Sequence, residues 1–405
     1  GSAAGIDLLL ELFDSTITAH LLPLVRRPEK GRRKLKLFNP NAMADFESYV
    51  EDRGEALLKG KDASLKVREF QVGIGYLTYQ VHADEKGRIL RAWSPGNGML
   101  AELEGFEGWI PEGVAPDGIE ELEVEISGPA GKLAGTLSRP RGAAKVPAVL
   151  ILSGSGPQDR HGNRVKGKGA LEEFAAAAPD AGLYRELARG LSASGVASLR
   201  VDDRGCGKSD GEFARARLSD LQADGAAALV FLRARPDLGA LGLIGHDEGA
   251  LLGMGLLEKD SAVKALLLLS APAGTLDEIL LSRAERQLRE QGMKDEALED
   301  LIAGQKRVFA GILASGEDFM EIDERRIFVG WLRDRFKRNP GELLSRVKVP
   351  LAAFHGGKDR DIPPSHLEQL QKLRPDMETR RFEGLDHVFY TGDRQVSEVN
   401  LNALV

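Results

Sequence analysis

The sequence predicts an α/β fold, in which a mostly parallel sheet is covered by helices on both faces, with a helical insertion and a small N-terminal α+β domain. Two observations support this prediction. From residue 119 onward, short apolar runs alternate with helical segments, a pattern typical of parallel strands joined by helices. Before residue 96 the pattern differs, and 405 residues exceed what one hydrophobic core organises. We therefore expect two domains of unequal size.

The smaller domain is expected over residues 1–95. Apolar residues recur at three- and four-residue steps over 6–25, which predicts an amphipathic helix. Apolar and polar residues alternate over 65–93 around a turn at 84–87, which predicts strands. The stretch 96–118 is rich in Gly, Pro and acidic residues and is predicted to be a linker.

The larger domain is expected over residues 119–405. Residues 123–126 and 133–137 predict an antiparallel pair of strands. The periodicity further predicts parallel strands at 146–152, 196–201, 241–244, 263–269, 349–354 and 377–382, and helices at 183–191, 218–232 and 249–257. Residues 276–345 are nearly all helical in pattern. An insertion between two strands of such a sheet is expected to lie over its carboxyl edge as a lid.

The composition excludes several classes of protein. The formal net charge of -7 argues against nucleic acid as the main partner. The single cysteine, Cys206, excludes a disulfide scaffold. No apolar run approaches the roughly 20 residues of a membrane helix, so no membrane partner is expected. The chain begins Gly1-Ser2 without Met, which is typical of a trimmed expression product, and the compartment is left open.

Ligands of open α/β sheets bind beyond the carboxyl ends of the strands, and one loop there has the pattern Gly-His-Asp-Glu-Gly. It spans Gly245–Gly249, directly after a predicted strand and directly before a predicted helix. Two flanking glycines allow a turn sharp enough to raise the central Asp247 out of the sheet. This is the geometry of a nucleophile elbow, which normally has serine at its centre. The alternative is an ordinary turn in which Asp247 caps the helix.

Two further loops carry a candidate acid and a candidate base. Asp359 follows the predicted strand 349–354 and can orient a histidine, and His387 follows the last predicted strand and is the candidate general base. The chain order of nucleophile, acid and histidine is the order that this fold uses. The alternatives are a turn built from Gly, Asp and Pro for Asp359, and a structural histidine for His387.

The loop after the strand 146–152 contains Gly154, Ser155 and Gly156. Its small residues can expose backbone N–H groups as one half of an oxyanion hole, and the N–H of Glu248 can supply the other half. The alternative is a flexible loop.

These motifs, in this order, closely resemble a bacterial branch of the α/β-hydrolase superfamily, the ester hydrolases related to dienelactone hydrolase. The resemblance covers roughly residues 120–395. The matching positions are 135–137, 154–160, 203–205 with Gly207 and Ser209, the elbow 245–249, Asp359 with Ile362-Pro363, and His387 with Phe389. Such family members often carry an NTF2-like N-terminal domain, and residues 1–95 resemble a divergent version of it.

The resemblance implies a triad, in which position 247 is the nucleophile, Asp359 the acid and His387 the base. It implies an oxyanion hole from the backbone of Gly154–Gly156 and Glu248. It also implies hydrolysis of an ester or related acyl bond in a small molecule, without a metal or other cofactor, and a lid that sets substrate selectivity.

The chain departs from the family pattern at one position, because that pattern reads Gly-His-Ser-Glu-Gly and this chain has Asp247. A serine attacks a carbonyl to give an acyl-enzyme that water cleaves. A carboxylate attacking the same carbonyl would give an anhydride and would have to expel an alkoxide, which is a poor leaving group.

Three interpretations follow. In the first, the chain is an ester hydrolase whose acylation is disabled by an engineered substitution or a natural loss, and Asp247 forms an ion pair with His387. In the second, Asp247 is a true nucleophile towards saturated carbon, as in haloalkane dehalogenases and epoxide hydrolases, with Trp331 as the candidate helper for the leaving group. In the third, the chain is a binding module that keeps the fold without the chemistry.

The side chain of Glu248 also has two interpretations. It can hydrogen-bond to hold the elbow in place. Alternatively, it is a solvated acid that the dipole of the following helix favours.

Overall fold

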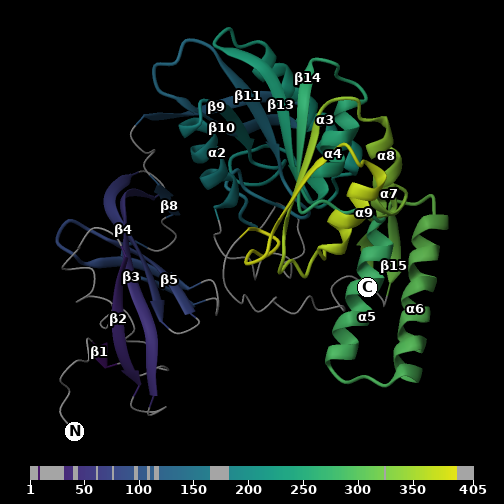
Figure 1. Cartoon of the computed structure of the whole chain (residues 1–405), viewed down its shortest axis with the longest axis horizontal. Helices are drawn as coiled ribbons and strands as arrows, with labels where there is room; N and C mark the ends of the chain where they lie inside the picture. Colours follow the sequence, from purple (N-terminus) through teal and green to yellow (C-terminus); the bar gives the residue numbers. More distant parts are fainter. Residues whose placement is uncertain are drawn as a thin grey trace. The chain divides into compact units, whose positions relative to one another are not determined.

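The computed structural model describes residues 8–9, 32–39, 44–60, 63–74, 77–94, 99–106, 110–113, 118–164, 182–322 and 325–389. The chain divides into two compact units, the first chiefly over Gly1–Pro116 and the second chiefly over Asp117–Gly392 (Figure 1). None of the described helices is both long enough and apolar enough to cross a membrane.

The described part of the first unit is a sheet of eight strands. The strands are β1 (Leu8–Leu9), β2 (Arg32–Asn39), β3 (Ala44–Lys59), β4 (Ser64–Ile74), β5 (Leu77–Ala83), β6 (Ile89–Ser94), β7 (Met99–Glu102) and β8 (Ile110–Gly113). Strands β1 to β7 lie in chain order, and β8 pairs with β3. All pairs are antiparallel except β1 with β2. A small core of Ala56, Leu58, Val67 and Leu90 lies on one face.

Two predictions for this unit need correction. Within the predicted helix over 6–25, Leu8–Leu9 form strand β1, and residues 10–25 lie outside the described residues. The predicted linker over 96–118 contains β7 and β8, which pair with β6 and β3. Their place in the sheet comes from partner strands elsewhere in the chain, which a local count of Gly, Pro and acidic residues does not reveal.

The described part of the second unit is built on a mostly parallel sheet of eight strands. They are β9 (Ile119–Gly128), β10 (Gly131–Pro140), β11 (Val146–Leu152), β12 (Ala197–Val201), β13 (Leu238–His246), β14 (Val263–Leu269), β17 (Leu351–Gly356) and β18 (Glu378–Phe382). Their spatial order is β9-β10-β12-β11-β13-β14-β17-β18. Only β10 runs antiparallel to both of its neighbours. The remaining neighbours are parallel, so their carboxyl ends meet at one edge.

Helices cover both faces of this sheet, as predicted. They are α2 (Leu183–Ala193), α3 (Leu218–Arg233), α4 (Glu248–Leu257), α8 (Pro340–Arg346) and α9 (Ser365–Leu373). Helix α2 packs on one face with Ile151 and Ile244. Helices α3, α4, α8 and α9 pack on the other face, where Leu150 and Leu152 point. Alternate residues of β11 therefore face opposite cores, which explains its continuous apolar sequence.

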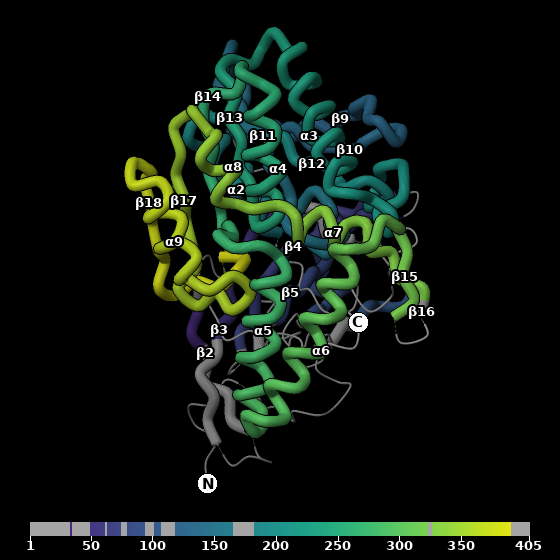
Figure 2. Tube along the Cα trace, turned by 90° about the vertical axis from the view of Figure 1, so that its right-hand side faces the viewer, coloured from purple at the N-terminus to yellow at the C-terminus, as the bar shows by residue number. Residues whose placement is uncertain are grey.

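The insertion between β14 and β17 has a small core of its own. It contains α5 (Leu276–Glu290), α6 (Asp295–Ala314), β15 (Phe319–Ile322), β16 (Arg325–Phe328) and α7 (Gly330–Phe336). Helices α5 and α6 run side by side in both views (Figures 1 and 2). Side chains from α6, β15, α7 and the residue before α7 form its core, which is Phe309, Ile312, Ile322, Val329, Leu332 and Phe336.

The predicted insertion over 276–345 needs two corrections. It is not all helix, because β15 and β16 form an antiparallel hairpin in it. Helix α8 does not belong with the small core, because Leu343 and Leu344 are buried in the main core of the second unit.

Candidate active site

The elbow is a strained turn between β13 and α4. Strand β13 ends at His246, helix α4 begins at Glu248, and Asp247 between them has φ 48 and ψ -111. Such a conformation is costly for a residue other than glycine and persists only where its surroundings enforce it. A Cβ atom at Gly249 would lie 2.3 Å from the carbonyl oxygen of Leu152. The glycine therefore lets the turn press against the neighbouring strand, as a nucleophile elbow requires.

The carboxylate of Asp247 is held by the loop after β11. The side chain is 9% exposed, and its Oδ2 accepts the backbone N–H of Ser155 at 3.2 Å. Burial alone would raise the pKa of Asp247. The charges of His387 and Arg335 and the bond from Ser155 outweigh burial and lower that pKa below the ordinary value. Asp247 is therefore an anion in this site.

Asp359 and His387 are in direct contact. Asp359 Oδ2 lies 2.9 Å from Nδ1 of His387, while Oδ1 accepts the N–H groups of Asp361 and Ile362. Burial opposes a charge on His387, but the charge of Asp359 and its hydrogen bond outweigh burial and raise the pKa of His387 to about 9. The same contacts hold the pKa of Asp359 far below its ordinary value, against the effect of burial.

Asp247 and His387 attract each other without touching. No hydrogen bond or ion pair joins this carboxylate to this imidazole, both of which are described. The expected ion pair is therefore absent, because Asp247 is turned toward the N–H of Ser155. Each charge still shifts the pKa of the other.

The prediction for Gly154 in the loop after β11 needs correction. The N–H of Gly154 donates to the hydroxyl of Tyr184 at 2.9 Å, so it is not available to an oxyanion. The N–H of Ser155 points at Asp247 instead. Gly156 lies beyond it with φ 85. The N–H of Glu248 is the first of helix α4, where backbone donors have no partner within the helix.

Glu248 connects the elbow to the insertion. Its side chain is 1% exposed, so the interpretation as a solvated acid is wrong. Oε2 lies 2.8 Å from Nε of Arg335 and accepts the indole N–H of Trp331 at 2.9 Å, both from α7. Burial raises the pKa of Glu248, and the charge of Arg335 opposes that rise. A second link joins α5 to the acid loop, where Arg283 donates to the carbonyl of Asp361 at 2.8 Å.

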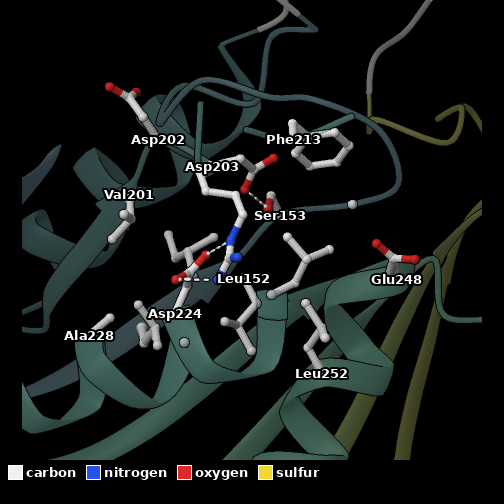
Figure 3. Close-up of a pocket in the computed structure, with 16 residues that line it drawn as sticks. Leu152, Ser153, Val201, Asp202, Asp203, Phe213, Asp224, Ala228, Glu248 and Leu252 are labelled. Carbon is white, nitrogen blue, oxygen red and sulfur yellow. Dashed lines mark hydrogen bonds and ion pairs between the residues drawn. The ribbon is translucent and has the colours of Figure 1, made fainter. Parts of the chain in front are cut away.

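A small cavity of about 40 Å³, lined by both apolar and polar side chains, lies beside Glu248 (Figure 3). Its lining includes Ser153, Asp203, Arg204, Asp224 and Glu248, but not the candidate nucleophile. One water needs about 10–15 Å³ measured in this way, so the space suits a few water molecules and no substrate.

Asp203 on the wall of this cavity supports the loop that carries Ser155. The hydroxyl of Ser153 donates to Asp203 Oδ1 at 2.6 Å, as Figure 3 shows, and the N–H of Gln158 donates to Oδ2 at 2.9 Å. Burial raises the pKa of Asp203 to about 8, against the effect of these two bonds.

Comparison with known proteins agrees with the architecture. A family model described as "Serine aminopeptidase, S33" (Hydrolase_4) matches residues 177–310. The esterase EstD of Thermotoga maritima is 23% identical over 293 residues, which is 72% of this chain and 65% of EstD. The match thus spans slightly less than two thirds of that relative.

Two solved structures are also similar to part of this chain. Est1E from Butyrivibrio proteoclasticus with bound ferulic acid is 18% identical, with a TM-score of 0.45 over 69% of this chain and 94% of Est1E. An esterase from Pyrococcus furiosus is 18% identical, with a TM-score of 0.43 over 67% of this chain and 84% of the esterase. Together, the order of the strands, the elbow after β13 and the family match decide the architecture. The second unit has the α/β-hydrolase fold.

The α/β-hydrolase fold brings the predicted loops to one edge of the sheet. It places Asp247 after β13, Asp359 after β17 and His387 after β18, and it places the N–H of Ser155 on the first of these. Sequence reasoning missed two residues of this α/β-hydrolase site. Tyr184 comes from helix α2 and Arg335 from the insertion, and no local motif marks either of them.

Proposed function

We propose that this chain is a carboxylic ester hydrolase of the dienelactone-hydrolase-related branch, with a site that Asp247 holds inactive towards esters. In this proposal position 247 is the nucleophile position, Asp359 the acid and His387 the base. The N–H groups of Ser155 and Glu248 form the oxyanion hole, and Gly156 shapes the loop.

One observation carries the proposal, the hydrogen bond from the N–H of Ser155 to Asp247 Oδ2 at 3.2 Å. A backbone N–H beside the nucleophile position can stabilise the negatively charged oxygen of a tetrahedral intermediate. In this chain the carboxylate of Asp247 already occupies that donor. A substrate carbonyl that enters the site therefore meets a negative charge in place of a free N–H.

The protonation of the base supports the same conclusion. His387 has a pKa raised to about 9, so it carries a proton at neutral pH. A general base must accept a proton from the attacking group. Asp359 is the main cause of this raised pKa, and the charge of Asp247 adds a smaller contribution, which replacement by serine removes.

The loop network favours the ester interpretation over an Asp-nucleophile hydrolase. Haloalkane and epoxide substrates require a group that stabilises the leaving halide or oxygen. The candidate for that role, the indole N–H of Trp331, donates to Glu248. This N–H is therefore already used in the contact between the elbow and the insertion, and it is not available to a leaving group. The insertion over α5 to α7 is proposed to act as the lid that selects the substrate and excludes water.

The test is hydrolysis of a short-chain p-nitrophenyl ester series by the parent chain, Asp247→Ser and Asp247→Ala. Serine is expected to create activity that requires His387, whereas the parent and the alanine variant remain inactive. The alanine variant removes the negative charge without adding a nucleophile. It therefore shows whether activity arises from loss of the charge at position 247 or requires acylation of a serine there. Activity of the parent equal to that of Asp247→Ser would refute the proposal, as would inactivity of all three proteins.

A separate assay addresses the Asp-nucleophile alternative. Haloalkane and epoxide substrates are turned over by the parent in water labelled with ¹⁸O. Incorporation of the label into the carboxylate of Asp247 would replace the present proposal with that alternative. If none of these substrates reacts with any variant, a binding module on a hydrolase fold is what remains.

A further inference from the structure

A series of short polar contacts connects two loops on either side of the elbow. One is the loop after β11 with Gly154–Gly156, called the oxyanion loop below, and the other is the loop of the candidate base His387. The N–H of Gly154 donates to Tyr184 Oη at 2.9 Å. Tyr184 Oη lies 3.0 Å from Nδ1 of His246. Nε2 of His246 lies 2.9 Å from the carbonyl oxygen of His387. Four separate parts of the fold are joined in this way, because these residues belong to the loop after β11, helix α2, the end of β13 and the loop after β18.

The direction of the proton at one end of this series follows from chemistry. A carbonyl oxygen can only accept a hydrogen bond, so the contact with His387 requires a proton on Nε2 of His246. Burial lowers the pKa of His246 to about 4, with the charge of His387 acting in the same direction. His246 is therefore neutral at neutral pH, and its Nδ1 carries a lone pair that needs a donor.

Tyr184 is the donor that meets this need. Its hydroxyl has one proton and two neighbours that can accept it, Nδ1 of His246 and Oε1 of Gln158, each at 3.0 Å. The NH₂ group of Gln158 donates to the carbonyl of Ser155 at 3.3 Å, and this long bond is lost if the amide turns over to present its NH₂ group to Tyr184. Nδ1 of His246 has no other donor among the described residues, so leaving it without a proton costs more. The proton therefore goes to His246, and Tyr184 Oη is left to accept from Gly154.

Tyr184 thereby decides which backbone donor faces the nucleophile position. Its hydroxyl accepts the N–H of Gly154, so this N–H does not face Asp247. The next N–H along the chain, that of Ser155, donates to Asp247. The approach is close, because a Cβ atom at Gly154 would lie 3.1 Å from Nδ1 of His246. At the other end, the hydroxyl of Ser270 also donates to the carbonyl of His387, at 3.2 Å.

We propose that Tyr184 and His246 are positioning residues, which hold the oxyanion loop and the loop of His387 in register across the elbow. The roles of those two loops rest on the proposed function, whereas the hydrogen-bond directions do not. The proposal therefore has one test that needs no activity and one that does.

The first test uses the parent chain as it is. Histidines labelled with ¹⁵N are observed by NMR between pH 5 and 8, and the signal of His246 is assigned with a His246→Gln variant. We expect the neutral form with the proton on Nε2, and a shift of Nδ1 in Tyr184→Phe, because that variant removes its donor. A proton on Nδ1, or an Nδ1 signal unchanged in Tyr184→Phe, would overturn the proposal.

The second test measures ester hydrolysis in the Asp247→Ser background. Loss of a whole oxyanion donor costs about 10²–10³ in kcat. A displaced donor loop costs less, so Tyr184→Phe is expected to lower kcat about tenfold to a hundredfold and to leave KM nearly unchanged. Tyr79→Phe is the matched control, because Tyr79 is a buried tyrosine of the first unit. Equal losses in both variants, or no loss in Tyr184→Phe, would refute the positioning role.

The two tests separate the two proposals. If Asp247→Ser is inactive and His246 has the expected tautomer, the proposed function fails and the hydrogen-bond series stands. If Asp247→Ser is active and Tyr184→Phe changes neither kcat nor the Nδ1 signal, the proposed function stands and the positioning role fails.

Discussion

Glu248 and Arg335 form an ion pair of 2.8 Å in which the two side chains are 1% and 2% exposed. Glu248 is the first residue of the helix that follows the elbow, and Arg335 belongs to the insertion. The two buried groups depend on each other, because neither reaches water if its partner is lost. Burial raises the pKa of Glu248 to about 7, so Glu248 can take up a proton when Arg335 is lost, whereas Arg335 keeps its charge.

Removal of either partner is therefore expected to destabilise the second unit strongly. Glu248→Leu and Arg335→Met should each lower the free energy of unfolding by about 3–5 kcal/mol, and the double variant by much less than the sum. Urea unfolding followed by tryptophan fluorescence measures these changes. Glu285→Gln is the control, because it removes an exposed partner of Arg289 and should cost no more than about 0.5 kcal/mol. Additive losses in the double variant would contradict the expected coupling.

The raised pKa of His387 predicts a pH dependence of stability. The pKa is about 9 in the folded chain and about 6.5 in an unfolded chain. The folded state binds this proton more tightly, so the stabilisation is complete below pH 6.5 and is lost as the pH rises through 9. The change is at most about 3–4 kcal/mol. Urea unfolding at four pH values between 6 and 10 should show this decline in the parent and a smaller one in His387→Gln. Parallel curves would contradict the assignment.

Asp203 is expected to tolerate a neutral, isosteric replacement. Burial raises its pKa to about 8, so the side chain carries a proton at pH 7. Asn at this position keeps an acceptor for the N–H of Gln158, and the hydroxyl of Ser153, which donates to Asp203 Oδ1, can turn to accept from the NH₂ group of Asn. Asp203→Asn should therefore change the free energy of unfolding by less than about 1 kcal/mol, whereas Asp203→Ala should cost about 1–3 kcal/mol.

The difference in stability between the parent and Asp203→Asn should also depend on pH. The unfolded carboxyl loses its proton at about pH 4 and the folded one only at about pH 8. Between these two values the stability of the parent should fall, while Asp203→Asn escapes that part of the decline. A loss in Asp203→Asn as large as that in Asp203→Ala would indicate that the carboxyl group is charged at pH 7.

The elbow predicts a sharp contrast between two glycines. A Cβ atom at Gly249 would lie 2.3 Å from the carbonyl oxygen of Leu152, whereas one at Gly190 in helix α2 would have no neighbour within 4 Å. Gly249→Ala should cost at least about 2 kcal/mol. Gly190→Ala should stabilise the chain by about 0.5–1 kcal/mol. Thermal unfolding of both variants checks the contrast, and a stable Gly249→Ala variant would show that the turn is not tightly enclosed.

The strands buried on both faces were the most predictable elements. Val146–Leu152 and Val263–Leu269 have the predicted bounds, because each is a continuous apolar run between turn signals. Strand β13 extends beyond its predicted ends to Leu238–His246, since its outer residues join the sheet through pairing with β11 and β14. The hairpin of β15 and β16 was missed, because its short apolar segments also fit a helix of the insertion.

The candidate site was predictable where topology alone places it. Parallel strands bring the loops of Asp247 and His387 to one edge, whatever the side chains do. The partners of these loops were not predictable in the same way. Tyr184 contacts Gly154 from a helix 30 residues later, and Arg335 meets Glu248 across 87 positions of the chain. Local spacing contains no information about such pairs.

The insertion is fastened at two loops of the site, by Arg335 on Glu248 and by Arg283 on the acid loop. A flap that swings open as a rigid body would have to break both attachments and expose a buried charge pair. Helix α5 is also tied to the acid loop near its end, because Arg286 donates to the carbonyl of Arg360 and Glu290 pairs with the side chain of Arg360. We therefore expect any opening motion to occur in α6 of the α5–α6 hairpin, with α5 and α7 staying in place. Substrates would then differ in how far they reach along that hairpin, while the geometry at the elbow remains the same for all of them.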